Sequence, residues 1–306
     1  MATVNILLAT YNGEKYIEQQ LLSLIGQSYR DWQLLVHDDG STDATLELVK
    51  KWQHIDKRIQ IVEDGKSFRS AAGNFMHLLQ YSTSPFVAFC DQDDIWFEKK
   101  LEILVNFASN NFDELVPCLV YADGYAYSDS EGVIISQSIS HLHAFKLNEF
   151  LFFNSGYQGC SMLFNSCLVN MAKNYRAAFY MHDDLVSLLA HVFGKVYFIP
   201  KQLMLYRQHQ NNVTGNTDKS KASIALRFFR RGAFVISRKH YDEKNEFYKE
   251  FKAKMSDRDR LLFAQYLKFP EVSLLRRLCI ILRNEFSMGG YRLPLLVKTL
   301  IRRPIE

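Results

Sequence analysis

Short apolar runs alternate with amphipathic segments along the first two hundred residues of the chain. Four runs have the length and composition of buried strands: Val4–Ala9, Leu34–His37, Ile59–Glu63 and Phe86–Cys90. The segments between these strands carry apolar residues at helical spacing, which predicts helices. The expected helices are Glu14–Gln27, a helix capped by Ser41 or Asp43 that runs through Trp52, and Gly73–Tyr81. Strands that alternate with helices in this way form parallel sheets joined by right-handed crossovers. The pattern therefore predicts an α/β fold with a mostly parallel central sheet flanked by helices.

The same alternation continues to about residue 200. The elements expected there are a strand pair within Leu119–Tyr127 around Asp123 and Gly124, a loop and strand in Gly156–Phe164, a helix at Met181–Phe193, and a strand at Lys195–Ile199. No internal repeat and no low-complexity tract interrupts this order. The first part of the chain is therefore expected to form one domain.

The charge of the chain divides it into two regions. Residues 1–219 carry 17 Lys and Arg against 24 Asp and Glu, whereas residues 220–306 carry 20 against 9. The first region is predicted to be the α/β domain, and the second a basic helical region with an anionic partner. Its expected helices are Ile224–Ser237, Tyr241–Met255 and Ser273–Arg283.

The last of these helices is strongly amphipathic. Ser273–Arg283 is predicted to place four apolar residues on one face and three arginines opposite: Leu274, Leu278, Ile281 and Leu282 against Arg276, Arg277 and Arg283. Such a helix can lie on an anionic membrane. It can equally be a solvated helix that covers the rest of the protein or forms a dimer contact, so an oligomer stays open.

Composition narrows the class of protein. With 48% hydrophobic and 23% charged residues among 306, the chain is expected to be a soluble globular protein. Its five cysteines show no paired metal-ligand spacing and are expected to be free thiols in a reducing compartment. The N-terminus has no pattern of a signal peptide, and no stretch of about 18 apolar residues predicts a membrane span. A cytoplasmic protein without a nucleic-acid partner is expected.

Candidate chemistry is densest after the strand Phe86–Cys90. Three carboxylates follow it within four residues: Asp91, Asp93 and Asp94. Ligands of open α/β sheets bind at the carboxyl ends of strands, and clustered carboxylates there favour a divalent cation such as Mg²⁺ or Mn²⁺. The alternative is that these acids cap a following helix.

Two earlier strand ends carry polar side chains. Thr10, Tyr11 and Asn12 follow the first strand, and Asp38 and Asp39 follow the second. Neither loop is a G-x-G-x-x-G or a Walker A sequence, which disfavours a dinucleotide cofactor or a P-loop. Hydrogen-bonding groups beside an aromatic ring suit a base and a ribose. Each loop alone also fits an ordinary turn and helix cap, with Gly40 at the turn.

Two further groups of polar residues lie later in the chain. His182, Asp183 and Asp184 stand at the start of the expected helix Met181–Phe193. Arg207 and His209 are two residues apart on an extended segment, which places them on the same side. A lone histidine is more often structural, but a second cation on the same side favours a contact with a pyrophosphate or a metal.

Taken in order, six motifs of the chain resemble those of the family-2 glycosyltransferases with the GT-A fold. They are LLATYNGEKYIEQQL, VHDDGSTD, FCDQDDIW, GYQGCS, MHDD and YRQHQNN, within Val4–Gly215. FCDQDD, GYQG, HDD and YRQHxxN together resemble bacterial rhamnosyltransferases of cell-surface polysaccharide assembly.

The resemblance implies a role for each candidate residue. The nucleotide-sugar site would comprise Thr10, Tyr11, Asn12, Glu14, Asp38, Asp39, Asp91 and Arg207, the metal site Asp93 and His209, and the catalytic base Asp183, with Asp184 as second candidate. Among these, Asp39 would contact the nucleobase of the donor, and Asp91 would contact the sugar or the ribose. The family places a Glu-Asp pair before the helix of the base, whereas this chain has His182 and Asp183 and adds a second acid.

These expectations describe a metal-dependent inverting glycosyltransferase. It would move a sugar, with L-rhamnose from dTDP-rhamnose as first expectation and a UDP-hexose as alternative, to a growing polysaccharide or a lipid-linked saccharide. One carboxylate base and in-line displacement invert the anomeric centre. A lipid-linked acceptor would bring the protein to the inner face of the plasma membrane. Rival classes are a sugar nucleotidyltransferase, disfavoured because no Gly-rich basic loop follows the first strand, and a non-catalytic assembly subunit, disfavoured because all the acids and His209 are present.

Overall fold

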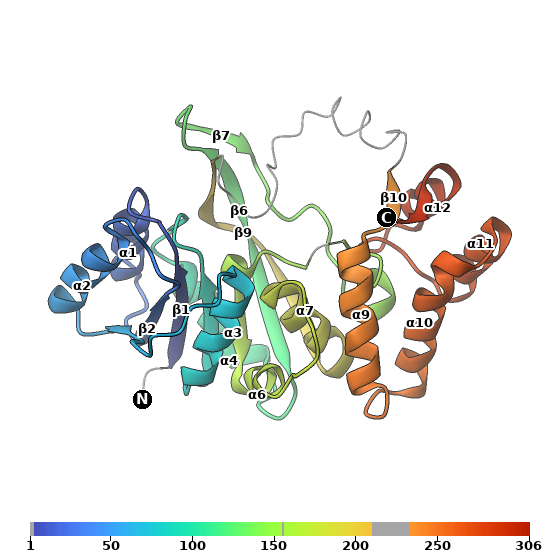
Figure 1. Cartoon of the computed structure of the whole chain (residues 1–306), viewed down its shortest axis with the longest axis horizontal. Coiled ribbons are helices and arrows are strands. Elements are labelled where there is room, and N and C mark those ends of the chain that lie inside the picture. Colours follow the sequence, from blue (N-terminus) through green and yellow to red (C-terminus); the bar gives the residue numbers. More distant parts are fainter. Residues whose placement is uncertain (1–2, 155, 210–232) are drawn as a thin grey trace. The chain divides into compact units, whose positions relative to one another are not determined.

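The computed structural model describes residues 3–154, 156–209 and 233–306 (Figure 1). These residues form two compact units, each built from several segments of the chain. Unit 1 comprises Met1–Ser140, Tyr157–Asn174 and Tyr197–Thr217, and unit 2 comprises His141–Gly156, Tyr175–Val196 and Asp218–Glu306. Unit 2 thus combines the basic C-terminal region with two segments from the range 1–219.

Unit 1 contains the alternating strands and helices that the sequence predicts. Its elements are β1 (Val4–Thr10), α1 (Ile17–Ile25), β2 (Trp32–Asp38), α2 (Thr45–Ile55), β3 (Ile59–Ile61), α3 (Ala71–Tyr81), β4 (Phe86–Cys90), β5 (Ile95–Trp96), α4 (Lys100–Asn111), β6 (Cys118–Ser128), β7 (Val133–Ser136), η1 (Gly159–Ser161), β8 (Met162–Asn165), α6 (Ser166–Lys173) and β9 (Lys195–Gln208), whose first two residues belong to unit 2. The sheet runs in the order β3-β2-β1-β4-β8-β6-β9-β5, with β7 beside β6.

The first four strands of this order are parallel, and their register brings the polar strand ends together. Thr10 at the end of β1 pairs with Asp38 at the end of β2, and Leu8 of β1 pairs with Cys90 at the end of β4. The loops that begin at Tyr11, Asp39 and Asp91 therefore leave the same edge of the sheet. β8 is antiparallel to both β4 and β6.

Helices pack on both faces of the parallel strands, as alternating side chains require. Val4, Ile6 and Leu8 of β1 belong to a buried cluster that also contains Leu21 of α1 and Leu104 of α4. On the other face, Phe75 of α3 contacts Phe89 of β4 with ring centroids 5.2 Å apart. Because both faces are covered, the predicted α/β class with a central sheet is confirmed.

The prediction of a strand pair around Asp123 and Gly124 is wrong. Both residues lie inside the single strand β6. A Cβ at Gly124 would lie 2.8 Å from the Met204 side chain, so the glycine permits close packing against β9 rather than a turn. Asp123 is buried because its carboxylate accepts hydrogen bonds from the backbone N–H groups of Gly124, Ile139 and Ser140.

Unit 2 is largely helical. Its elements are α5 (Leu147–Phe150), α7 (His182–Phe193), β10 (Phe234–Ile236), α9 (Arg238–Phe251), α10 (Asp257–Lys268), η2 (Phe269–Glu271), α11 (Leu274–Arg283), α12 (Arg292–Ile301) and β11 (Arg303–Ile305), and β10 pairs with β11 in parallel. Phe152 lies at its centre, with ring centroids 5.0 to 5.2 Å from Tyr266, Phe269 and Phe286. This aromatic cluster explains why His141–Gly156 folds with the C-terminal helices.

The tail differs from its predicted pattern in two places. Most of the expected helix Ile224–Ser237 lies outside the described residues, and its last part forms β10. In α11 the expected apolar face is divided: Ile281 is buried together with Ile280, whereas Leu274 and Leu282 are exposed. Among the described residues, no helix is long and apolar enough to cross a membrane.

Candidate active site

The acidic loop after β4 does not cap a helix. The next helix, α4, begins at Lys100, and no side chain caps its first turn. Between Asp94 and α4 the chain instead forms the short strand β5, which pairs with β9. The three carboxylates therefore stay at the edge of the sheet, and the helix-capping alternative fails.

Asp93 and His209 meet at this edge. His209 Nε2 lies 2.7 Å from Asp93 Oδ2, and both side chains are more than four-fifths buried. The imidazole stacks on Tyr16, with ring centroids 4.8 Å apart. The two residues expected to hold a metal are thus brought together from segments more than a hundred residues apart.

Arg207 lies beneath this pair and holds the loop in place. Its Nε donates to the backbone carbonyl of Asp93 at 2.7 Å, and its Nη2 donates to Gln19 Oε1 at 2.6 Å. Its Nη1 binds Asp129, and its backbone N–H donates to Asp94 Oδ1 at 3.2 Å. Because Arg207 is 3% exposed, its described contacts are those of a residue that positions the acidic loop.

Asp91, which is partly buried, and Asp94, which is buried, form a cluster with the buried thiol of Cys160. Ligating atoms of the three residues lie within 4.8 Å of one another. Burial, followed by repulsion from the Asp93 carboxylate, raises the pKa of Asp91 to about 7 and that of Asp94 well above its ordinary value. Such carboxylates lose their protons readily only when positive charge is brought close to them.

Lys100 supplies part of that charge, and the sequence analysis did not single it out. Its Nζ is buried under the loop, donates to the Cys160 carbonyl at 2.6 Å and lies 3.7 Å from the centre of the Trp96 ring. Burial lowers its pKa to about 8. The signal in the sequence is helical spacing, because Lys100 shares the buried face of α4 with Leu104 and Ala108.

The loops after β1 and β2 are tied together by their own polar groups. Thr10 Oγ1 donates to Asp38 Oδ1 at 2.9 Å, and Asp38 also accepts the backbone N–H groups of Gly40 and Ser41. Asn12 Oδ1 accepts the Thr42 N–H at 2.8 Å, and Asn12 adopts a left-handed φ of 46°.

Glu14 makes a similar tie, since its Oε2 accepts the Ala44 N–H at 2.9 Å. Asp39 is 6% exposed, and its carboxylate accepts the N–H groups of Phe68 and Ser70. The loop at residues 64–70 is therefore attached to Asp39.

The side chain of Tyr11 is exposed, at 57%. Gln92 fixes its backbone from both sides, because Gln92 Oε1 accepts the Tyr11 N–H at 2.9 Å and Gln92 Nε2 donates to the Tyr11 carbonyl at 3.0 Å. A Cβ at Gly13 would overlap the Gln92 side chain. The aromatic ring of Tyr11 is therefore held on a rigid loop next to the acidic cluster.

Asp183 and Asp184 lie in unit 2, in the first turn of α7. Asp183 is partly exposed and its Oδ1 accepts the Asp184 N–H at 3.0 Å. Asp184 is 7% exposed, and its Oδ2 lies 2.9 Å from His240 Nδ1. A Cβ at Gly156 would strike the Asp184 carboxylate. The two acids thus differ: Asp184 is packed into unit 2, and Asp183 is the more accessible.

His182, the residue that departs from the family pattern, is buried beside them. Burial lowers its pKa to about 3, so the ring is neutral at physiological pH. A neutral buried imidazole cannot replace the charge of the glutamate expected there. The chemistry of this helix start is therefore left to the two aspartates.

Comparison with known proteins places the chain in a family. Residues 5–174, more than half of the chain, match the family described as glycosyl transferase family 2. The dTDP-rhamnosyl transferase RfbG of Shigella flexneri is 30% identical over 70% of this chain and 76% of that protein. The chain belongs to glycosyl transferase family 2. A second relative is the Escherichia coli protein named UDP-Glc:alpha-D-GlcNAc-diphosphoundecaprenol beta-1,3-glucosyltransferase WfgD. It is 36% identical to this glycosyltransferase over a shorter stretch, which covers 35% of this chain and 42% of WfgD.

Solved structures share the fold of this glycosyltransferase. S. aureus TarS 1-349 in complex with UDP-GlcNAc gives a TM-score of 0.60 at 17% identity, over 93% of this chain and 73% of TarS. The mannosyltransferase PcManGT of Pyrobaculum calidifontis, in complex with GDP-Man and Mn²⁺, gives 0.54 at 17% identity, over 98% and 87%. The GT-A-like fold predicted from the motifs is confirmed.

The residues of this glycosyltransferase fit a divalent cation. Carboxylate oxygens and an imidazole nitrogen are ligands that Mn²⁺ and related ions accept. Burial and the neighbouring Asp93 carboxylate raise the pKa of Asp91 and of Asp94, and a bound cation would favour the ionised form of both. Asp93 and His209 are the side chains that would hold the ion, with Asp91 beside them.

Proposed function

We propose that this glycosyltransferase transfers a sugar from a nucleoside diphosphate to a saccharide acceptor, with inversion at the anomeric carbon and with Mn²⁺ or Mg²⁺. The observation that supports this best is the pairing of Asp93 with His209 at 2.7 Å, close to Asp91, at the edge where three parallel strands end. Family membership supports the reaction class, and this pairing supports a diphosphate site at the same edge of the sheet.

The loops after β1 and β2 provide the nucleoside end of the site. Tyr11 offers an exposed ring on a backbone that Gln92 holds, and Asp39 offers a buried carboxylate after the neighbouring strand β2. Thr10, Asn12, Glu14 and Asp38 keep the two loops in register through the hydrogen bonds described above. In this proposal their role is to shape the site, and Tyr11 and Asp39 make the contacts with the base.

The diphosphate end depends on charge. A divalent cation bound to Asp93 and His209 would supply positive charge for the leaving diphosphate. Arg207 keeps the backbone of Asp93 in place and, through Asp129, contributes to the same charge balance. Lys100 lowers the cost of keeping Asp91 ionised beneath the sugar.

The acceptor hydroxyl needs a base, and Asp183 is proposed for it. The partly exposed position of Asp183 suits proton transfer better than that of the buried Asp184. A single base acting opposite the leaving group inverts the anomeric centre. A sugar nucleotidyltransferase or a non-catalytic subunit would not need a base at this position.

The sugar is proposed to be L-rhamnose carried by dTDP, and the polymer a bacterial cell-surface polysaccharide. Support comes from the 30% identity to RfbG over most of both chains. A UDP-linked hexose is the second candidate, because WfgD is named for UDP-Glc and TarS was crystallised with UDP-GlcNAc.

A panel of nucleotide sugars tests both proposals in one experiment. With Mn²⁺ present, dTDP-rhamnose at a hundredfold excess over its Kd is expected to stabilise the protein by about 2.7 kcal/mol, read as a thermal shift. Release of dTDP on addition of acceptor would follow. A larger shift with a UDP-hexose would replace the rhamnosyl proposal, and no shift with any nucleotide sugar would overturn the reaction class.

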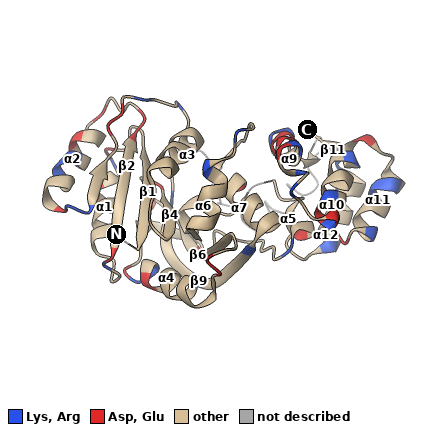
Figure 2. Ribbon diagram, turned by 90° about the horizontal axis from the view of Figure 1, so that it is seen from below, with Lys and Arg blue, Asp and Glu red and all other residues tan. Residues whose placement is uncertain are grey.

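An anionic membrane surface is proposed as a partner of unit 2. Leu275 of α11 and Leu293 of α12 are 76% and 70% exposed, and Leu282 and Leu300 are more than half exposed. Figure 2 shows Lys and Arg positions, in blue, along the ribbon of α11. Exposed leucines next to arginines form the pattern of a helix that lies at a membrane interface.

Replacing Arg276 and Arg283 by glutamate is therefore expected to release the protein from anionic vesicles. Each basic residue near such a surface contributes about 1 kcal/mol. Arg277 is left unchanged, because its guanidinium donates to the carbonyls of Phe269 and Pro270. Flotation with phosphatidylglycerol vesicles measures binding, and nucleoside diphosphate release should stay at the wild-type rate.

The matched control is the double substitution Lys252→Glu and Arg258→Glu. It makes the same change of charge at exposed positions of unit 2 away from α11 and α12. If both variants lost flotation equally, the net charge of the protein, and not the position of the arginines on α11, would explain vesicle binding. Unchanged flotation of the Arg276 and Arg283 variant would assign these helices to packing or to a dimer contact.

A further inference from the structure

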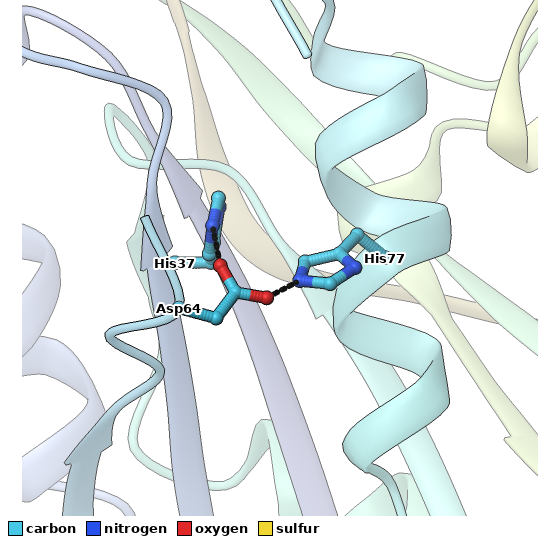
Figure 3. Close-up of side chains that lie close together, drawn as sticks. All are labelled: His37, Asp64 and His77. Atoms are coloured by element: carbon cyan, nitrogen blue, oxygen red, sulfur yellow. Dashed lines mark hydrogen bonds and ion pairs between the residues drawn. The ribbon is translucent and has the colours of Figure 1, made fainter. Parts of the chain in front are cut away.

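A second group of possible metal ligands lies in unit 1, away from the acidic cluster. His37 of β2, Asp64 after β3 and His77 of α3 converge from three different elements (Figure 3). His37 Nε2 is 3.4 Å from Asp64 Oδ1, and His77 Nε2 is 2.7 Å from Asp64 Oδ2. The ligating atoms of all three lie within 4.8 Å of one another.

Asn74 fixes the orientation of the His37 ring. Its side-chain Nδ2 donates to the His37 carbonyl at 3.1 Å, so its Oδ1 faces His37 Nδ1 at 2.7 Å. An amide oxygen only accepts, so Nδ1 of His37 must carry a proton. In the neutral ring, the lone pair is then on Nε2 and points at a carboxylate oxygen of Asp64. Two electron-rich atoms that face each other at 3.4 Å, one of them on the buried His37, are stabilised by a cation between or on them.

Two kinds of cation satisfy this geometry: a proton on His37 or a metal ion shared by the three residues. The donor set favours a metal. Two imidazole nitrogens and one carboxylate oxygen are a common ligand set for Zn²⁺, and a hydrogen bond to the second ring nitrogen, such as that from His37 to Asn74, typically orients such a ligand. His37 is 2% exposed and the side chain of His77 9%, so the site is closed on the imidazole side.

The distances also suit an ion. Two ligands of a tetrahedral Zn²⁺, each at 2.0 to 2.2 Å, lie about 3.4 Å from each other. The separation of His37 Nε2 and Asp64 Oδ1 already has this value. The pair of His77 and Asp64 is at hydrogen-bond distance and would open by about 0.7 Å to admit an ion. Three protein ligands leave a fourth position for water.

Two neighbours of Asp64 compete with an ion for its carboxylate. Lys66 Nζ lies 3.5 Å from Asp64 Oδ2, but the Lys66 side chain is 59% exposed and free to turn into solvent. Tyr81 donates its hydroxyl to the same oxygen at 3.0 Å, which leaves a lone pair for a metal. Neither neighbour closes the position between the two imidazoles.

We propose that His37, Asp64 and His77 form a binding site for a divalent transition-metal ion, with Zn²⁺ as the best match. The site joins the loop at residues 64–70 to β2 and α3. That loop also donates the backbone N–H groups of Phe68 and Ser70 to the Asp39 carboxylate. The rings of Phe68 and His77 are in contact, with centroids 4.7 Å apart. Bound there, the ion would fix the loop that holds Asp39.

The test is a Zn²⁺ titration of metal-stripped protein in the Asp93→Ala background, which removes the acidic-loop site. Isothermal titration calorimetry is expected to show a Zn²⁺ site that depends on Asp64 and His77, whatever other ligand groups of the chain bind. Asp64→Asn and His77→Gln should each weaken Zn²⁺ binding at this site at least tenfold. Losing a partner of a metal ligand already costs 10-fold to 100-fold in metal affinity, and losing the ligand itself should cost at least as much. His54→Gln, at an exposed histidine of α2, is the control and should bind as the parent does.

Co²⁺ provides a readout that needs no variant. Bound by two imidazoles and a carboxylate in a four-coordinate site, it should show intense visible absorption, which Zn²⁺ then displaces. Absence of Zn²⁺ binding, or equal affinity in the parent, Asp64→Asn and His77→Gln, would overturn the proposal and leave a proton on His37 as the cation. If the variants do not fold, the Co²⁺ spectrum of the parent decides alone. The outcome is independent of the glycosyltransferase reaction.

Discussion

Replacing Asp93 by alanine is expected to abolish Mn²⁺-dependent turnover and to weaken binding of the nucleotide sugar. The substitution removes the carboxylate that pairs with His209 at 2.7 Å. Loss of a second-shell partner of a metal typically costs 10-fold to 100-fold in metal affinity, so loss of a ligand should cost about 100-fold or more. Calorimetry with the nucleotide sugar, with and without Mn²⁺, measures the effect, together with the rate of nucleoside diphosphate release.

The fold of the Asp93→Ala variant should survive. Asp93 is one of the charges that raise the pKa of Asp91, so its removal relieves repulsion within the buried cluster. Glu114→Ala, at an exposed acid after α4, serves as control and should retain full activity. If the Asp93 variant kept both its affinity and its response to Mn²⁺, the pair with His209 would be structural and the metal would have to be assigned elsewhere.

Much of unit 1 could be predicted because its signals are local. A buried strand followed by polar residues places those residues at the sheet edge, and parallel pairing then brings Thr10 beside Asp38. The sequence could not tell which polar groups face a ligand and which bind their neighbours. Asp38 and Glu14 use their oxygens to hold backbone N–H groups, and this depends on how loops far apart in sequence meet.

The wrong predictions arose where packing decides against local preference. The Asp123-Gly124 step favours a turn in isolation, yet it lies within β6 because Ile139 and Ser140 need an acceptor for their N–H groups. In α11 the helix was predicted, but which of its apolar residues are buried depends on the contacts with α12 and η2, and these leave no signal within α11 itself. Lys100 was overlooked because a lysine at the start of a helix is normally exposed.

The two acids of α7 should respond differently to the loss of one oxygen. Asp183→Asn keeps the size and polarity of the side chain but cannot take a proton, so turnover should fall by about 10² to 10⁴. Binding of the nucleotide sugar and of Mn²⁺ should persist. Asp184→Asn should leave turnover within about tenfold, because successive residues of a helix point about 100° apart and cannot address the same hydroxyl.

Stability should show the opposite order. Asp184 is buried against His240 and Gly156, so Asp184→Asn weakens a buried polar contact and is expected to cost about 1 to 3 kcal/mol of unfolding free energy. Asp183 is partly exposed, and Asp183→Asn should melt close to the wild type. Measuring kcat and the urea midpoint for both variants separates the two roles. An inactive Asp184→Asn of normal stability, with an active Asp183→Asn, would move the base to Asp184 and leave the glycosyltransferase assignment intact.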